Sequence, residues 1–448
     1  MWWLLYDPNF QWVVAGSTLL GITSGVVGSF ALLRGRSLLG DVLAHSALPG
    51  VCIAFMVTQS KEVAPLLLGA ALAGIASVRC VDAITRWSRT KEETALAVVL
   101  TVFFGLGIVL LTAIQHSGAG NQSGLDDFLF GQAAAMVGSD VYVVALVSAA
   151  ILAAVVLFFK EFKALCFDPA FAAGAGLNVR LLDALLMALV VLAVVTGLQA
   201  VGVVLMAALL VTPAIAARYW TDRLSVMVAL AGLFGGVSGA AGTLLSTAAP
   251  KLPTGPLTVL SATALFFVSL AFAPRKGLVA KALRLFRLRR RIARENLLRA
   301  VYERYETALS APAVADDNLL NRGIDLSRLA SDTGSGRRML RLARALEKEG
   351  LLALNQESGR TVCTLTARGL AAAWEVVHKH RLWEMFLMHE ASLGADHVDR
   401  DADDIEHFLG PEVIKELEKL LRLHHREPRL LPSVHPLHGA GENPVGAP

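Results

Sequence analysis

Long apolar runs separated by short polar segments make up most of the chain as far as Pro274. A helix needs about 20 apolar residues to cross a hydrocarbon core ~30 Å thick. Segments of that length predict nine membrane-spanning helices, at 12–33, 39–58, 63–85, 94–115, 138–159, 181–199, 201–218, 225–247 and 255–273, of which the seventh has the weakest pattern. Small residues recur within them, as in Gly21-x-x-x-Gly25 and at 235–242, and they predict close helix packing rather than a ligand-binding loop.

The composition agrees with a polytopic membrane protein. Hydrophobic residues make up 55% of the 448 residues and charged residues only 17%, and the mean hydropathy is +0.56, which excludes an ordinary soluble protein of this size. Charged residues become frequent from Arg275 onward, so we expect a membrane domain followed by a soluble domain. Much of the net charge of +4 lies beside the last apolar span, and membrane topology explains it better than a nucleic-acid partner.

Basic residues in the loops predict the orientation of the chain. They gather in alternate loops, whereas the opposite loops hold only Lys61 and Lys251. Because cytoplasmic loops carry the excess of Lys and Arg, the N-terminus is expected outside and the soluble domain in the cytoplasm. No basic region precedes the first apolar run, so we expect that run to be kept as a membrane span rather than cleaved as a signal peptide.

Two ionisable residues interrupt the second apolar segment. Asp41 and His45 are four residues apart, so on a helix they share one face and can converge on a single point. Ionisable groups inside a membrane are costly unless they face a bundle interior or a water-filled pathway, which makes the pair a candidate metal-binding site. The alternative is a buried Asp–His ion pair that only fixes helix packing.

The loop at 159–180 differs from the other connections. It carries Phe167-Asp168-Pro169 before a run of small residues, which predicts a short amphipathic helix with Asp168 near its N-terminus. Such a helix could dock a partner protein, and a connector lying in the membrane interface is the alternative.

The soluble part divides into four segments by pattern. A basic linker helix is expected at 277–315, a winged helix-turn-helix at 316–370, a further helical region at 371–426 and a disordered tail at 427–448. Within the winged helix, helices are expected at 325–330 and 335–350 and strands at 351–354 and 361–365. Arg337, Arg338 and Arg341 on the second helix are candidate DNA contacts, although winged helices also serve as protein-interaction modules.

Several sequence blocks in the membrane half carry a family resemblance. They are Ser37–Gly50, Leu129–Gln132, Phe167–Pro169, Ala200–Leu205, Leu210–Ala214 and Thr254–Pro256. Residues 10–276 thereby resemble the permeases of bacterial manganese, zinc and iron ABC importers, the ABC-3 family. The resemblance implies that Asp41 and His45 contact Mn²⁺, Zn²⁺ or Fe²⁺ in the translocation pathway, and that Phe167, Asp168 and Pro169 meet the ATPase subunit.

The same resemblance implies a set of partners in the bacterial inner membrane. These are a separate ABC ATPase, an extracytoplasmic metal-binding protein, a second permease copy or paralogue, and the surrounding membrane lipid. No G-x-x-x-x-G-K-[ST] phosphate loop occurs in the sequence, so ATP hydrolysis is expected on another subunit and the chain is not expected to be an enzyme. Its four scattered cysteines predict neither disulfides nor a cysteine zinc site, and no tightly bound cofactor is expected.

The cytoplasmic half, at about 295–423, is similar to metal-dependent repressors of the diphtheria-toxin-repressor type. The segments that carry this resemblance are His378–Leu387 and Asp401–His407. The metal ligands that it implies are His380, Asp403, Glu406 and His407. Asn296 and Arg299, however, stand where manganese regulators carry acids, and an arginine cannot ligate a cation. A reduced sensor site and a vestigial dimerisation domain therefore both stay open.

Together these features predict an all-α polytopic membrane protein with a cytoplasmic winged-helix and helical dimerisation domain. The leading hypothesis is the permease subunit of an ATP-driven importer of divalent transition metal, with a metal-sensing or regulatory domain. The alternative is a membrane-tethered, metal-dependent DNA-binding regulator. In a third hypothesis, cytosolic metal binds the fused domain and inhibits import.

Overall fold

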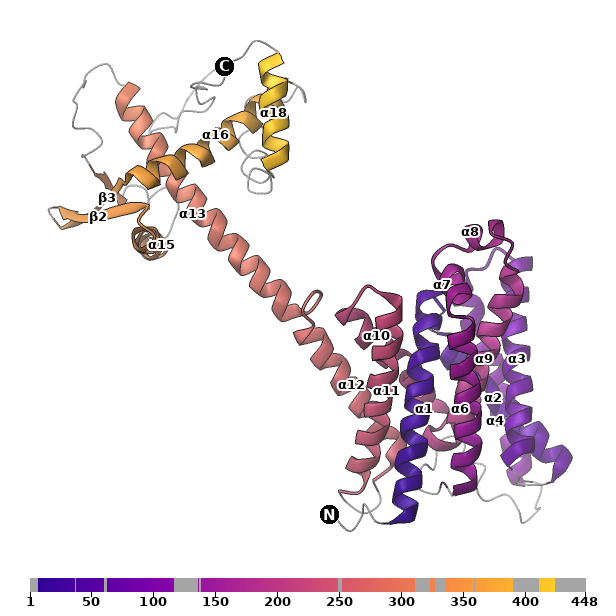
Figure 1. Cartoon of the computed structure of the whole chain (residues 1–448). Coiled ribbons are helices and arrows are strands. Elements are labelled where there is room, and N and C mark those ends of the chain that lie inside the picture. The colour runs from indigo at the N-terminus through magenta and orange to yellow at the C-terminus, as the bar shows by residue number, and fades with distance from the viewer. Residues whose placement is uncertain are drawn as a thin grey trace, which may run out of the picture. The chain divides into compact units, whose positions relative to one another are not determined.

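The structure is a computed structural model, and it describes residues 7–36, 38–59, 63–116, 136, 138–248, 252–310, 323–326, 336–357, 359–389 and 411–423 (Figure 1). The chain forms two compact units, residues 1–282 and 283–448. Almost all described residues of the first unit are helical, and strands occur only in the second unit within the described part. The all-helical membrane fold predicted from the apolar runs is therefore confirmed.

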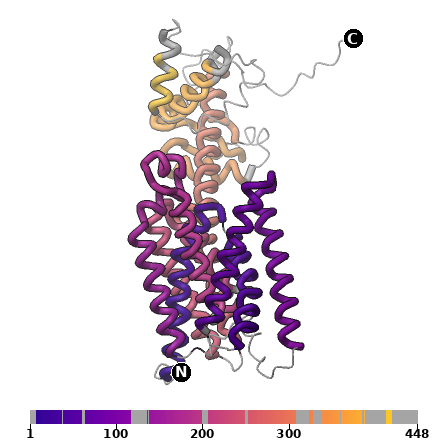
Figure 2. Tube along the Cα trace, turned by 90° about the vertical axis from the view of Figure 1, so that its right-hand side faces the viewer, coloured from indigo at the N-terminus to yellow at the C-terminus, as the bar shows by residue number. Residues whose placement is uncertain are grey.

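The first unit is a bundle of apolar helices that run side by side, as Figure 2 shows. Its helices are α1 (Pro8–Leu33), α2 (Leu39–Thr58), α3 (Val63–Trp87), α4 (Glu92–His116), α6 (Gly138–Leu157), α7 (Phe159–Phe167), α8 (Pro169–Gly174), α9 (Val179–Val201), α10 (Val203–Trp220), α11 (Leu224–Ser246) and α12 (Thr254–Phe272). Among the described residues, eight helices are long and apolar enough to cross a membrane, whereas the apolar part of α10 is shorter, at Met206–Trp220.

The predicted seventh span corresponds to α10, and a glycine separates it from α9. Gly202 lies between the two helices with φ +87°, a left-handed conformation that glycine adopts without steric cost. The two helices are therefore distinct elements joined by a single-residue break, and α10 is the shorter of the two.

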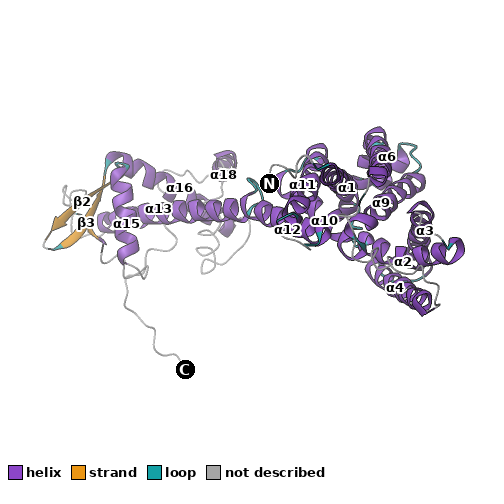
Figure 3. Cartoon of the chain, turned by 90° about the horizontal axis from the view of Figure 1, so that it is seen from below, coloured by secondary structure: helices purple, strands orange, loops and turns teal. Residues whose placement is uncertain are grey.

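Glycines bring α1 and α11 into backbone contact, which confirms the close packing predicted from their spacing. A Cβ placed on Gly21 would lie 2.1 Å from the carbonyl oxygen of Gly235, and one on Gly25 would lie 2.2 Å from that of Ala231. Without a hydrophobic driving force between helices in lipid, such close approach supplies the van der Waals contact that holds them together. The two helices are neighbours in the view of Figure 3, with α11 on the side of α12.

The second unit combines a small antiparallel sheet with helices. Its elements are α13 (Leu278–Ser310), which begins at the end of the first unit, β1 (Ile324–Asp325), α15 (Gly336–Lys348), β2 (Leu352–Glu357), β3 (Arg360–Leu365), α16 (Ala367–His389) and α18 (Pro411–Leu423). The strand order is β1-β3-β2, and all pairs are antiparallel. The core beneath the sheet includes Leu297 and Val301 of α13, Leu346 of α15, Cys363 of β3 and Ala373 of α16.

One predicted element of the winged helix is wrong at its start. Asp325 was expected to open a helix over 325–330, but it belongs to β1 and pairs with Val362 of β3. The reason is non-local, because the third strand forms only when β3 supplies hydrogen-bonding partners. The helix at 335–350 is confirmed as α15, and the two strands are confirmed as β2 and β3, with β2 extending to Glu357. Residues 327–330 and the tail at 427–448 lie outside the described residues.

Candidate metal pathway site

The first two turns of α2 carry the candidate pair. Helix α2 begins at Leu39, so Asp41 lies in its first turn and His45 one turn later. A carboxylate at this position is stabilised by the partial positive charge of the helix N-terminus. Because both side chains project from one face, the helix brings them together without any long-range contact.

The carboxylate of Asp41 lies next to the imidazole of His45, one nitrogen of which makes no hydrogen bond within the described part of the chain. Asp41 Oδ1 lies 3.4 Å from His45 Nε2, and the His45 ring meets the ring of Phe104 edge to face at 4.8 Å between centroids. The Asp41 side chain is 43% exposed and that of His45 is 17% exposed. His45 Nδ1 is buried and has no hydrogen-bond partner among the described residues.

This donor set suits a first-row divalent metal passing through. A carboxylate oxygen and a neutral imidazole nitrogen bind Mn²⁺, Fe²⁺ or Zn²⁺, and the distance between them allows an ion to contact both. The described residues contain no group of three or more His, Cys, Asp and Glu side chains that could hold a metal. Within that part of the chain, the site therefore offers two ligands.

Two arginines in the turn between α1 and α2 form a cluster with three acidic residues of other helices, which was not predicted from the sequence. This arginine cluster consists of Arg34, Arg36, Asp82, Glu92 and Asp183. Asp183 accepts from Arg34 at 2.9 Å and from Arg36 at 3.3 Å. Arg36 also lies 2.8 Å from Glu92 and 3.6 Å from Asp82, so it links the α1–α2 turn to α3, α4 and α9. From the sequence, basic residues in the loops were used only to predict the orientation of the chain. The acidic residues expected at the same end of neighbouring spans could have indicated that Arg34 and Arg36 form ion pairs there.

The expected ATPase-contact loop forms two short helices. Asp168 caps α8, because its carboxylate accepts a hydrogen bond from the backbone N–H of Phe171 at 2.8 Å. Pro169 is the first residue of α8, and Phe167 and Phe171 are both exposed. The loop therefore presents two aromatic side chains beside a rigid cap, and its role toward an ATPase stays a prediction.

Helix α15 has a basic face and an apolar face. Arg338, Arg341 and Arg344 are exposed, whereas Met339 and Ala343 on the other face are buried. Arg337 lies in the first turn, and its side chain is outside the described residues. The fold of this helix is compatible with the DNA contact, which stays a prediction.

His380 is buried in the second unit and is in contact with an arginine. Its Nδ1 lies 3.0 Å from Nη1 of Arg299, whose Nε in turn lies 2.9 Å from Glu303. Because a guanidinium can only donate, the Nδ1 atom accepts that hydrogen bond, and a nitrogen engaged in this way does not fit a metal ion. The other implied ligands, Asp403, Glu406 and His407, lie outside the described residues.

Comparison with known families defines the class of protein. Residues 6–273 match the model of the ABC 3 transport family, and residues 366–434 match that of the iron dependent repressor, metal binding and dimerisation domain. The chain therefore belongs to the ABC 3 transport family and carries a repressor-type C-terminal domain, so both predicted resemblances are confirmed. The Leu129–Gln132 block of the membrane half lies outside the described residues.

Individual relatives match either nearly the whole chain or about three fifths of it. The chain is 48% identical to the manganese transport system membrane protein MntC of Bacillus subtilis, over 97% of both chains. It is 45% identical to the zinc transport system membrane protein TroC of Treponema pallidum, over 62% of this chain and 93% of that protein. Among solved structures it is similar to PsaBC from Streptococcus pneumoniae in complex with Fab, with 31% identity and a TM-score of 0.56 over 63% of this chain and 96% of the other.

Proposed function

We propose that the chain is the permease subunit of an ATP-driven importer of divalent transition metal, Mn²⁺, Zn²⁺ or Fe²⁺. The observation that carries the proposal is the Asp41–His45 pair, in which a half-exposed carboxylate oxygen lies 3.4 Å from the imidazole Nε2 atom on one face of α2. The relatives named for manganese and zinc transport support the choice of cargo.

The position of the pair favours passage over retention of the ion. Metal binding requires the neutral form of His45, while Asp41 contributes the negative charge that attracts the cation. The positive end of the α2 dipole opposes that attraction, since both residues lie within the first two turns. Two ligands weakened in this way hold a cation briefly, as a transport pathway requires.

The proposal includes partners that the chain itself does not supply. A separate ATPase would dock on the exposed Phe167–Pro169 segment and α8, and an extracytoplasmic metal-binding protein would deliver the ion. A second copy or a paralogue would complete the pathway, with the N-terminus outside and the repressor-type domain in the cytoplasm.

Uptake measurements in cells test the pathway. Asp41→Asn and His45→Gln keep side-chain size but remove the metal-binding atoms, and we expect each to reduce accumulation of ⁵⁴Mn²⁺ or ⁶⁵Zn²⁺ by at least about tenfold. Asp222→Asn, an exposed carboxylate elsewhere in the membrane unit, is the matched control and should not change uptake. Unchanged accumulation in both site variants, at wild-type abundance in the membrane, would contradict the pathway assignment.

A second candidate function rests on the basic face of α15. We propose that Arg338 and Arg341 contact DNA phosphates, which would make the chain a membrane-tethered regulator as well. The full chain in lipid nanodiscs should then bind a labelled DNA duplex with strong salt dependence, and Arg338→Gln should reduce both affinity and salt slope. Equal binding by the wild type and the variant would show that this face does not contact DNA.

A further inference from the structure

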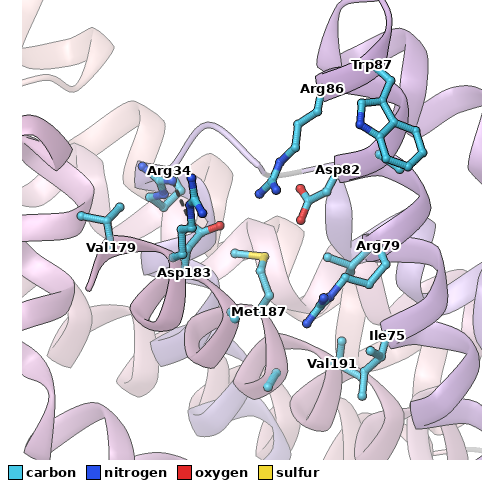
Figure 4. Close-up of a pocket in the computed structure, with 15 residues that line it drawn as sticks. Arg34, Ile75, Arg79, Asp82, Arg86, Trp87, Val179, Asp183, Met187 and Val191 are labelled. Carbon is cyan, nitrogen blue, oxygen red and sulfur yellow. Dashed lines mark hydrogen bonds and ion pairs between the residues drawn. The ribbon is translucent and has the colours of Figure 1, made fainter. Parts of the chain in front are cut away.

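A cavity of about 780 Å³ opens between α3 and α9 (Figure 4). The two helices run in opposite directions, so residues near the end of α3 come level with residues near the start of α9. Arg86 and Asp82 therefore lie at the same end as Asp183, whereas Ile75 and Val191 form the floor. The cavity thus has a charged end and an apolar end.

Helix α3 continues this pattern beyond the cavity. Leu68, Leu72 and Ile75 are exposed apolar residues, and Arg79 and Arg86 follow on the same face. Their spacing of three, four or seven residues places them in one stripe along the helix. The stripe is apolar over two turns and basic thereafter. Such a stripe can contact a single molecule that has an apolar part in the membrane interior and a charged part at the membrane surface.

The basic end of the cavity has an excess of positive charge. Arg79, Arg86 and Arg180 line the cavity, and none of the three forms an ion pair with another described residue; Figure 4 shows Arg86 at the charged end and Arg79 pointing toward Ile75 and Val191. The two carboxylates in the cavity are already engaged, since Asp183 pairs with Arg34 and Asp82 lies 3.6 Å from Arg36. Three uncompensated guanidinium groups favour an anionic ligand, and phosphate is the anion that arginine binds best in a bidentate manner.

The length of the apolar stripe on α3 decides the kind of ligand. Ile75 lies eleven residues before Arg86, which is about 16 Å along a helix, and Leu68 lies about another 10 Å deeper. A phosphate at the arginine level would leave this apolar stripe uncovered, whereas a phospholipid covers both. Trp87, fully exposed beside Arg86, is typical of the membrane–water interface.

We propose that the groove between α3 and α9 binds an anionic phospholipid. The headgroup phosphate lies at the charged end with Arg86 and Arg180, Arg79 adds positive charge between that end and the floor, and one acyl chain runs along Ile75 and Leu72. The site is distinct from the Asp41–His45 pair, because His45 packs on Phe104 of α4, which Figure 3 shows on the side of α2 away from α9. Basic pockets between membrane helices on the cytoplasmic side bind such headgroups.

Native mass spectrometry of the full chain, titrated with phosphatidylglycerol or phosphatidylcholine in detergent, tests this site. We expect half-occupancy at a phosphatidylglycerol concentration at least about tenfold below that of phosphatidylcholine. Arg79→Gln with Arg86→Gln should raise the phosphatidylglycerol concentration needed by about 25-fold, roughly fivefold per arginine. The control, Arg218→Gln with Arg223→Gln, removes two exposed arginines at α10 and α11 and should leave binding unchanged.

A second variant keeps every charge. Ala184→Trp fills the groove from α9 at an exposed position and should abolish phosphatidylglycerol binding without unfolding the chain. Retained binding in a folded Ala184→Trp protein, or equal binding of the two lipids by the wild type, would overturn the proposal. Displacement of the lipid by millimolar inorganic phosphate would also overturn the proposal and show that the cavity is a simple phosphate site. Loss of self-association in Ala184→Trp with lipid binding unchanged would assign the groove to a second copy.

Discussion

Asp183→Asn should destabilise the membrane unit more than any loss of an exposed ion pair. The substitution keeps the size of the side chain but removes the charge that Arg34 and Arg36 share at 2.9 and 3.3 Å. All three side chains are largely buried, with exposed fractions of 20%, 19% and 16%. Two guanidinium groups would then lie next to each other without their common partner, because Asp82 and Glu92 contact only Arg36.

The expected loss of stability in Asp183→Asn follows from the two hydrogen bonds that Asp183 accepts from Arg34 and Arg36. A hydrogen bond to a charged group contributes about 1.5–3 kcal/mol, so the pair has an upper limit of about 3–6 kcal/mol. Partial exposure screens the charges, and we therefore expect Asp183→Asn to lower the free energy of unfolding by about 2–3 kcal/mol. Arg34→Gln in the Asp183→Asn background should recover part of this loss, since it removes one unpaired charge.

Equilibrium unfolding of the full chain in detergent micelles measures this effect. The matched control is Asp222→Asn, which removes an exposed carboxylate paired with Lys276 and should cause no measurable loss. If Asp183→Asn cost less than about 0.5 kcal/mol, the arginine cluster would be an ordinary surface ion pair and the reasoning from burial would be wrong.

Three further predictions concern packing, the repressor-type domain and a buried thiol. Gly21→Ala forces a Cβ to within 2.1 Å of a carbonyl oxygen of α11, and thermal unfolding should show a loss of about 1–3 kcal/mol, whereas Gly105→Ala, inside α4 with open space around it, should cause no loss of stability. Arg299→Ala removes the guanidinium that donates to His380 Nδ1, so calorimetry should detect tighter Mn²⁺ or Zn²⁺ binding than in the wild type; His380→Gln should abolish that gain. Burial raises the pKa of the Cys363 thiol from 9.0 to about 12, so alkylation at pH 8 should be about a thousandfold slower in the folded chain than in the unfolded one. Because the thiol ionises at lower pH in the unfolded chain than in the folded one, Cys363 should also lower the free energy of unfolding as the pH rises above about 9. Equal alkylation rates in the folded and unfolded chains would show that burial does not raise the pKa of this thiol.

The features that the sequence predicted are those set by local pattern. Apolar length alone placed the membrane helices, and a spacing of four residues brought Asp41 to His45. The contacts that were not predicted depend on residues far apart in the sequence. Arg34 and Asp183 are 149 residues apart and meet because the end of α1 lies beside the start of α9. The same holds for β1, which exists only where β3 pairs with it. The sequence also showed Arg299 in a ligand position, but its contact with His380 required the fold.

The backbone contact between α1 and α11 has a mechanical consequence. Side chains normally let packed helices slide, because they can change rotamer as the surfaces move. At Gly21 and Gly235 no side chains intervene, so any sliding would drive one carbonyl oxygen into the opposite main chain. We therefore expect the two helices to move as a single rigid body in any change of conformation. Bending is then left to segments such as α2, where Pro49 interrupts the hydrogen-bond ladder one turn beyond His45.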